Sequence, residues 1–400
     1  MRSLHVRPAA VLPGGTGREA VAALLAALPG ALDGSAPAVH PVDPGAALPP
    51  GPAVPPGVAA VVRTSGSTSG TGHLVALDGA GLLASARATH ARLAGPGQWV
   101  ACLPSHHIAG LQVLVRSVVA GTRPVVLDTA AGFRAADLAA AVRRLDPGAP
   151  GYLSLVPTQL ARVMADDDTV AALRGLAAIL VGGARTAPAL LESARAAGLP
   201  VVTTYGMTET GGGCVYDGVA LDGVEVEVDA DSRIWITGPV LARGYLDDPA
   251  ADRATFHERD GRRRLRTNDR GRLTGRTLTV LGRLDDVIVT GGLNVSAAAV
   301  EHALGDLAGV GDLVVVGVPD DHWGALVTAV VTGPEAPGLA EVRDHVAARL
   351  GRHHAPRALI RVGELPLRGP GKVDRLGAAG LARALLTAGG PDVERHATGS

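Results

Sequence analysis

A glycine- and hydroxyl-rich segment, "RTSGSTSGTGHL" at residues 63–74, is the first candidate for chemistry. It follows the apolar run "VAAVV" at 58–62 and precedes a predicted helix. Glycines let the backbone curl so that N–H groups and hydroxyls converge on an anion, which suits phosphate groups. The segment lacks the Gly-Lys-Ser/Thr of a Walker loop, and Gly70-x-Gly72 lacks the third glycine of a dinucleotide fingerprint. Taken alone, it is either a phosphate loop or a flexible turn.

A second candidate is "TTYGMTETGGG" at residues 203–213. We expect a strand to end at the Tyr205-Gly206 pair and to deliver Thr208 and Glu209 at its carboxyl end. Ligands of open α/β sheets bind at that edge, and a carboxylate beside a hydroxyl can hold Mg²⁺ against a triphosphate. The alternative for Glu209 is a solvated side chain in a glycine-rich loop.

Two further segments lie in the second half of the chain. Asp269, in "RTNDRGRL", is expected in a turn between strands, where it either accepts hydrogen bonds from both hydroxyls of a ribose or serves only the turn. The segment "GRLDDVIVTGGLNVS" contains Arg283, Asp285 and the pair Gly291-Gly292. Its many turn-forming residues indicate a hinge between two parts of the chain.

The only lysine of the sequence is Lys372, in "LPLRGPGKVDR", whereas every other fixed positive charge is an arginine. A lysine ammonium is compact and sits on a flexible stem, so it can serve several oxygens as charge shifts between them, which a planar guanidinium does less well. The alternative is an ordinary loop lysine.

The elements around these motifs predict an α/β fold. Short β-branched runs alternate with Ala/Leu-rich helical stretches up to about residue 206, which is typical of largely parallel strands. After 220 the alternation of apolar and polar residues indicates antiparallel strands. We therefore predict a large N-terminal domain of mixed and parallel sheets with a β-rich part at 1–284, a small mobile α+β domain at 285–384, and a flexible tail at 385–400.

Composition narrows the class of function. The 400 residues are 47% hydrophobic, which is enough for a large core, and the net charge of -1 provides no basic field for nucleic acid. Cys102 and Cys214 are far apart and lack CxxC spacing, so neither a zinc site nor a disulfide framework is predicted. No signal peptide and no apolar run of membrane-spanning length is evident. We expect a cytoplasmic protein without membrane insertion.

In this order, "TSGSTSGTG", "YGMTE", "ND" before a Gly-Arg strand, "GRLDDVIVTGG" and "GKVDR" resemble the adenylate-forming superfamily of acyl-CoA synthetases, adenylation domains and luciferases. The resemblance spans residues 58 to 376 or so. Within it, "CLPSHHIAGLQVLVRS", "LSLVPTQLAR" and "ETGGGCVYDG", with the short N-terminal region, are similar to the o-succinylbenzoate–CoA ligases of menaquinone biosynthesis, especially their actinobacterial forms.

The resemblance implies a two-step reaction. A carboxylate attacks the α-phosphate of ATP to give an acyl-adenylate and pyrophosphate, and the thiol of coenzyme A then displaces AMP to give a thioester. The resemblance implies ATP and Mg²⁺ as cofactors, with coenzyme A as a co-substrate and a small carboxylic acid as the substrate. It is also compatible with a homodimer.

Residue roles follow from the same resemblance. The implied phosphate-binding residues are Thr64, Ser65, Gly66, Ser67 and Thr68. Glu209 with Thr208 would position Mg²⁺ and the α-phosphate. The adenine and acyl pocket would be lined by Gly182, Gly183 and Ala184, with Tyr205 and Gly206 near the adenine and Asp269 and Arg283 on the ribose. Asp285 would be the hinge, Gly291 and Gly292 would admit the pantetheine arm, and Lys372 would reach the acyl carboxylate and α-phosphate in the first step.

The acyl pocket is assigned from two residues of one predicted helix. His107 falls where the family has a residue that gates the pocket, and Arg116 lies about two and a half turns further along. A succinylbenzoate carries a second carboxylate, which Arg116 would pair with unless it makes a structural salt bridge.

One departure from the family concerns the phosphate loop. The family has x-Pro-Lys after its Ser/Thr-Gly, but this chain reads Ser69-Gly70-Thr71-Gly72, and His73 is the adjacent residue that would partly replace the lysine. Two alternatives to the coenzyme A ligase remain. One is an enzyme that passes another aryl or short acyl group to a carrier protein, which would share every ATP motif, and the other is a non-catalytic nucleotide-binding homologue. The altered loop favours the latter, and the retained Glu209, Asp269 and Lys372 oppose it.

Overall fold

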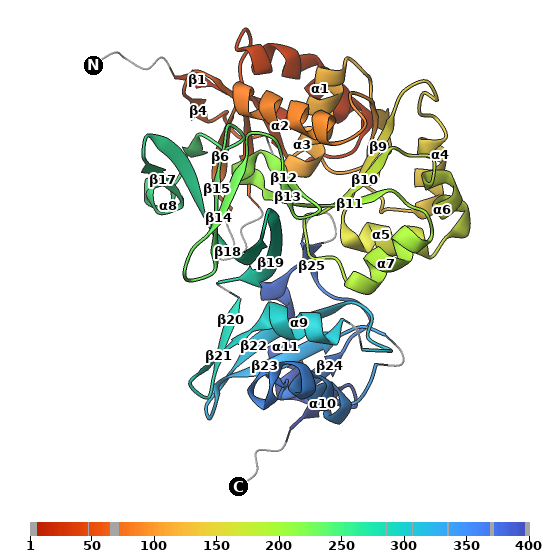
Figure 1. The fold of residues 1–400 in the computed structure, drawn as a ribbon, viewed down its shortest axis with the longest axis vertical. Coiled ribbons are helices and arrows are strands. Elements are labelled where there is room, and N and C mark those ends of the chain that lie inside the picture. The colour runs from red at the N-terminus through yellow and green to blue at the C-terminus, as the bar shows by residue number, and fades with distance from the viewer. Residues whose placement is uncertain are drawn as a thin grey trace.

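The computed structural model describes residues 6–46, 48–64, 72–284, 286–305, 307–333, 336–368 and 372–396, with the backbone alone at 368 and 372. It consists of a large N-terminal part and a smaller C-terminal part, drawn above and below in Figure 1. The α/β fold with a β-rich segment and a small second domain is therefore confirmed.

Parallel strands form one half of the main sheet, in the order β8-β7-β9-β10-β11. These strands are β7 (Gln98–Ala101), β8 (Val125–Val126), β9 (Gly151–Leu155), β10 (Ala178–Val181) and β11 (Val201–Met207). Alternate residues face opposite sides, so Trp99 and Val100 belong to different cores. Strand β10, with the sequence AILV, is buried along its whole length and is a continuous apolar run, as expected for a central parallel strand.

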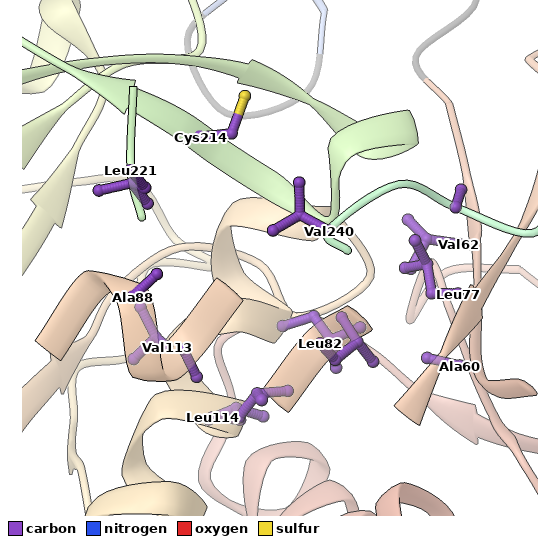
Figure 2. Packing of buried hydrophobic residues seen from close by; sticks show 14 of the residues in the cluster. Ala60, Val62, Leu77, Leu82, Ala88, Val113, Leu114, Cys214, Leu221 and Val240 are labelled. Atoms are coloured by element: carbon purple, nitrogen blue, oxygen red, sulfur yellow. The ribbon is translucent and has the colours of Figure 1, made fainter. Parts of the chain in front are cut away.

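Helices cover the two faces. The first face packs against α1 (Arg18–Asp33), α2 (Gly79–Arg92) and α3 (Ile108–Ala120). The second packs against α4 (Ala135–Val142), α5 (Pro157–Met164), α6 (Asp167–Leu173) and α7 (Pro188–Ala196). Figure 2 shows the first core, where Leu82 of α2 and Leu114 of α3 meet Val62 and Leu77 of a neighbouring sheet.

The main sheet continues in antiparallel order through β12-β13-β19-β18-β15-β14, as the alternating pattern predicts. The strands are β12 (Gly212–Tyr216), β13 (Val219–Ala220), β14 (Glu225–Val228), β15 (Arg233–Thr237), β18 (Arg262–Thr274) and β19 (Thr277–Arg283). A further strand, β17 (Phe256–Arg259), follows α8 (Pro249–Thr255) and pairs with β18. Asp269 lies inside β18, so its predicted place in a turn is wrong: a long strand carries it opposite Arg283 of β19.

A second sheet, in the order β16-β6-β5-β3-β2, carries the start of the phosphate segment. It contains β2 (Ala10–Pro13), β3 (Val39–Val42), β5 (Val58–Arg63), β6 (Leu74–Asp78) and β16 (Gly244–Tyr245), and β1 (Arg7–Pro8) pairs with β4 (Ala53–Val54) beside it. The segment 64–73 therefore joins two antiparallel strands, because β6 intervenes before helix α2.

The C-terminal part begins with the hairpin of β20 (Val287–Thr290) and β21 (Leu293–Ser296). A sheet in the order β22-β23-β24-β27 packs against helices on both faces. Its elements are α9 (Ala297–Leu304), β22 (Leu313–Asp320), β23 (Gly324–Val331), α10 (Leu339–Leu350), β24 (Ala358–Arg361), α11 (Arg375–Ala388) and β27 (Val393–Arg395), with the small hairpin β25 (Leu367–Arg368) and β26 (Lys372–Val373).

The flexible tail predicted from residue 385 is wrong for residues 385–396. Helix α11 continues to Ala388, and β27 pairs with β24 through Leu359 and Glu394. The polar sequence "PDVERH" predicts a solvent-exposed segment. A short edge strand nevertheless forms through backbone hydrogen bonds to one neighbouring strand and the packing of one face, and side-chain composition does not reveal either of these.

Cys102 and Cys214 are free and buried. Burial raises the pKa of both thiols to about 12, so they act as small apolar side chains of the core. No described helix is long and apolar enough to cross a membrane.

The stability of the protein is expected to fall at acidic pH because of His90, a buried residue of α2. Burial, with Arg116 nearby, lowers the pKa of His90 to about 4 from the usual 6.5. Between these pH values the unfolded chain binds the proton and the folded chain does not, so unfolding becomes easier as the pH falls through this window. We expect a loss of about 2 kcal/mol between pH 7 and 4.5, less than the full pKa shift would give because this range ends above the pKa of the folded state.

Urea unfolding between pH 4.5 and 7 measures this effect. The pH slope should be smaller in His90→Gln than in the wild type, and it should be retained in His322→Gln, which changes an exposed histidine. An equal slope in all three proteins would contradict the role of His90.

Candidate functional site

A cavity of 710 Å³ lies between the start of the phosphate segment and the segment that precedes α3. The residues predicted to hold Mg²⁺ and the nucleoside, such as Glu209, Tyr205 and Asp269, are not among its lining residues. It is lined by side chains from the sheet that carries the phosphate segment, from the start of α3, from α5 and from the β25–β26 hairpin. The lining residues are His40, Pro41, Val42, Asp43, Ala46, Pro49, Arg63, Thr64, Pro104, His106, His107, Thr129, Phe133, Thr158, Gln159, Arg162 and Leu367. The cavity thus joins the two parts of the chain, because Leu367 belongs to the C-terminal part.

His107 lies in the cavity wall, immediately before α3. Its neighbour His106 also faces the cavity, and the two rings lie 4.4 Å apart. Burial lowers the pKa of His106, and its Nε2 lies 3.8 Å from Asp43 Oδ2, which acts in the opposite direction. The wall beside His107 is therefore polar.

The structure does not support the substrate role predicted for Arg116. Its side chain is buried under the main sheet, where it donates to the Tyr216 hydroxyl at 3.2 Å and lies 5.0 Å from the centre of the Trp99 ring. Arg116 is on the predicted helix but on the face that points into the core. The alternative predicted for Arg116 is a structural salt bridge, but its guanidinium contacts this hydroxyl and this aromatic ring instead of a carboxylate.

Arg162, which is not among the predicted site residues, brings a guanidinium to the cavity wall. It lies on α5 and lines the cavity together with Thr158, one turn earlier. The signal was present in "VPTQLAR", where Thr158 and Arg162 have i, i+4 spacing on a helix that directly follows a parallel strand. Helices that begin at the carboxyl end of such strands border the ligand crevice.

Asp269, Arg283 and Tyr205 form one polar group. The Tyr205 hydroxyl donates to Asp269 Oδ2 at 2.7 Å, and Arg283 lies 3.7 Å from Asp269 Oδ1. Burial, with Asp269 alongside, raises the pKa of Tyr205 well above its usual range, so the hydroxyl stays a donor. The structure therefore brings the three residues assigned to the nucleoside together, although they come from three strands.

The glycines at the ends of β10 and β11 are required by close packing. A Cβ at Gly182 would lie 2.1 Å from Thr204 Oγ1, and one at Gly206 would lie 2.1 Å from the Gly212 carbonyl oxygen. Gly183 and Ala184 follow at an exposed position beyond the end of β10. Strand packing alone thus accounts for Gly182 and Gly206.

Glu209 and Thr208 lie in a short 3₁₀ turn directly after β11, at the carboxyl end of the strand as predicted. The predicted end of the strand at Tyr205-Gly206 is wrong, because β11 continues through this pair to Met207. Glu209 Oε1 accepts a hydrogen bond from the Tyr245 hydroxyl at 2.7 Å, and this contact leaves the second carboxylate oxygen for a cation. No cluster of three or more His, Cys, Asp or Glu ligands occurs within the described ranges. One carboxylate and one hydroxyl fit Mg²⁺ when phosphate oxygens and water complete its shell.

Thr64 and His73, at the two ends of the phosphate segment, are hydrogen-bonded to each other, and we call this pair the neck of the segment. The Thr64 N–H donates to the His73 carbonyl oxygen, and the His73 N–H donates to Thr64 Oγ1, both at 2.9 Å. A Cβ at Gly72 would lie 1.7 Å from the Thr64 carbonyl oxygen, so this crossing requires glycine. Ser65, Gly66, Ser67 and Thr68 lie outside the described residues, as does the predicted hinge Asp285.

The backbone of Lys372 lies in the β25–β26 hairpin, opposite Arg368 and one pair away from the cavity-lining Leu367. Figure 1 shows this hairpin at the boundary between the two parts of the chain. Arg375 anchors its far end, since its guanidinium lies 2.6 Å from Glu301 and 3.4 Å from Asp286. The lysine segment is therefore held beside the cavity.

The two parts also meet away from this hairpin. Arg185, which follows β10, donates to the Ala298 carbonyl oxygen of α9 at 2.9 Å and contacts His302. Gly291 and Gly292 form the turn of the β20–β21 hairpin with positive φ values of 55° and 76°, and the Gly291 N–H donates to the Trp323 carbonyl oxygen at 2.9 Å. These glycines are not among the cavity-lining residues.

Comparison with known proteins gives consistent results. The family model for AMP-binding enzymes matches residues 18–246, and the model for the AMP-binding enzyme C-terminal domain matches residues 299–372. A probable 2-succinylbenzoate–CoA ligase of Mycobacterium tuberculosis is 46% identical over 94% of this chain and 97% of its own length. A 2-succinylbenzoate–CoA ligase of Listeria monocytogenes is 30% identical over 69% of this chain and 60% of its own.

Among solved structures, the o-succinylbenzoate CoA synthetase of Bacillus subtilis in complex with its acyl-adenylate intermediate matches with a TM-score of 0.68 and 26% identity. The match covers 84% of this chain and 74% of that one. Sequence, fold and family models agree, and the first model alone matches more than half of the residues. The chain therefore belongs to the AMP-binding enzyme family.

Proposed function

We propose that this enzyme is an ATP-dependent 2-succinylbenzoate–CoA ligase that acts in menaquinone biosynthesis. The observation that carries the proposal is one cavity whose lining includes Thr64 of the phosphate segment, His107 before α3, and Leu367 of the hairpin that carries Lys372. The likeness to the mycobacterial ligase over nearly the whole chain supports the acid named here.

In the first step, the substrate carboxylate oxygen attacks the α-phosphorus of ATP, the bond to the bridging oxygen breaks, and pyrophosphate leaves with the electron pair. Bound Mg²⁺ would neutralise phosphate charge, and Glu209 and Thr208 are the residues that would hold it. Asp269 would hold the ribose, since its carboxylate is already fixed by Tyr205 and Arg283. Lys372 would bring a positive charge from the C-terminal part to the reacting oxygens.

The lining of the cavity supports a dicarboxylic acid. Arg162 and Arg63 bring positive charge to its wall, and His40, His106 and His107 add further nitrogen donors, against the single carboxylate of Asp43. A second carboxylate buried in such a pocket needs a cation or several donors. We therefore assign to Arg162 the role that the sequence predicts for Arg116, which is to pair with the second carboxylate of the substrate.

A basic cluster on the C-terminal part supports coenzyme A as the acceptor. It consists of residues around the end of α10 and β27, namely Arg343, Arg352, His353, His354, Arg357 and His396. Burial lowers the pKa of Arg343 and Arg357, and in Arg343 the neighbouring arginines act in the same direction. Three arginines gathered in this way suit the phosphate groups of coenzyme A, and the histidines beside them add ring nitrogens.

The function is tested by pyrophosphate release with Mg·ATP and 2-succinylbenzoate, followed by thioester formation with coenzyme A. We expect acid-dependent release and a thioester only when coenzyme A is present. 4-Oxo-4-phenylbutanoate, which keeps the succinyl chain and lacks only the carboxylate on the ring, is the matched control acid and should react poorly. Release that depends on another acid, or transfer only to a carrier protein, would replace the proposal with the other adenylating activity. No release with any acid would indicate a non-catalytic homologue.

Two further expectations belong to this proposal. We propose a cytoplasmic location, because ATP and coenzyme A are supplied there and both cysteines are free thiols. A homodimer stays a prediction, and light scattering of the purified protein measures it.

A further inference from the structure

Tyr245 links two parts of the nucleotide site that are distant in sequence. Its hydroxyl donates to Glu209 Oε1 at 2.7 Å, and its ring stacks on the His73 imidazole with the centres 4.5 Å apart and the planes 27° apart. Glu209 follows the main sheet and His73 closes the neck of the phosphate segment in the other sheet. One side chain therefore contacts both.

The position of Tyr245 is fixed by contacts that do not involve Glu209. Its strand β16 pairs with β6 through Val75, and its backbone N–H donates to Asp252 Oδ1 at 2.9 Å. Phe256 packs edge-on against the ring, with the centres 5.6 Å apart. Because the backbone and the ring are held separately, the hydroxyl has a fixed place from which to orient a carboxylate.

The hydroxyl is also the right kind of donor. A tyrosine hydroxyl is an uncharged donor at neutral pH, and here it donates to Glu209 Oε1. A neutral donor occupies one oxygen of Glu209 without cancelling its charge, whereas an arginine or lysine there would compete with a cation. Glu209 thus keeps its charge and its second oxygen for a metal ion.

The His73 end of the link is fixed as well. His73 Nδ1 lies 3.8 Å from Asp247 Oδ1, and Arg63 lies 3.7 Å from the other oxygen of that carboxylate. The Asp247 carboxylate is itself held by the Leu74 N–H at 3.0 Å. The imidazole therefore lies between Tyr245 and a fixed carboxylate.

From these contacts we propose that Tyr245 is a positioning residue that holds Glu209 in the orientation needed for magnesium–nucleotide binding and ties it to the neck of the phosphate segment. The inference rests on the proposed function only in requiring that the protein bind Mg·ATP. Tyr245 acts through Glu209 and makes no contact with the reacting atoms in this scheme.

The test is Tyr245→Phe, which removes the hydroxyl and keeps the ring. We measure ATP binding by titration calorimetry at a series of Mg²⁺ concentrations, without acid or coenzyme A. The Mg²⁺ concentration for half-maximal ATP binding should rise about tenfold, the effect of losing one hydrogen bond to a charged group. Tyr152→Phe is the matched control, because it removes a buried hydroxyl that donates to the Gly95 carbonyl oxygen far from the site.

A double-mutant cycle separates positioning from general destabilisation. In Glu209→Gln, adding Tyr245→Phe should raise the Mg²⁺ requirement much less than it does in the wild type. Tyr245→Leu, which also loses the His73 stack, should bind Mg·ATP more weakly than Tyr245→Phe. Equal losses in both backgrounds, or an unchanged Mg²⁺ requirement in Tyr245→Phe, would overturn the inference alone. A wild type that binds no Mg·ATP would overturn the proposed function and this inference with it.

Discussion

Replacing Lys372 by alanine is expected to slow acid-dependent pyrophosphate release by about 10²- to 10³-fold, the usual cost of losing one preorganised electrostatic contact in a transition state. The backbone of this lysine lies in the β25–β26 hairpin, and the paired strand contributes Leu367 to the cavity wall. Single-turnover pyrophosphate release under saturating Mg·ATP and acid measures the effect on the first step.

Two comparisons make the Lys372 prediction specific. Thioester formation from supplied acyl-adenylate should change little in Lys372→Ala, because the lysine is assigned to the first step alone. Lys372→Arg keeps the charge but not the compact ammonium, so it should recover only part of the rate. If both half-reactions slow equally, the hairpin has a structural rather than a catalytic part.

Replacing Asp269 by alanine is expected to raise the KM for ATP by about 10²-fold, because hydrogen bonds from ribose hydroxyls to a charged acceptor are lost. It should also destabilise the protein by about 1–3 kcal/mol, since the Tyr205 hydroxyl and Arg283 lose their shared acceptor. Steady-state kinetics with varied ATP and urea unfolding measure the two effects separately.

The nucleotide itself provides the control for Asp269. The wild type should bind 2′-deoxy-ATP more weakly than ATP, and Asp269→Ala should discriminate little between the two. Asp269→Asn keeps the shape and one acceptor, so it should restore stability more than it restores the KM. Unchanged discrimination in Asp269→Ala would show that this carboxylate does not contact the ribose.

The class of fold could be predicted from the sequence alone, because it depends on local patterns. The sequence predicts Glu209 directly after a strand, largely parallel strands before residue 206 and antiparallel strands after 220. The structure has these features, except that β5 and β6 pair antiparallel. Such features depend on residue type, spacing and hydrophobic period within a short segment, and these are written in the sequence itself.

The tertiary structure decided which side chains meet across long separations. Arg116 and Arg162 are both arginines on helices that follow strands, yet α3 turns the first into the core and α5 turns the second toward the cavity. Asp269 was expected in a turn but gains Arg283 as a partner through strand register, and Tyr245, in no recognised motif, reaches both Glu209 and His73. The physical reason is that helix rotation, strand pairing and close packing depend on the whole core, whereas a motif specifies only its own backbone and side chains.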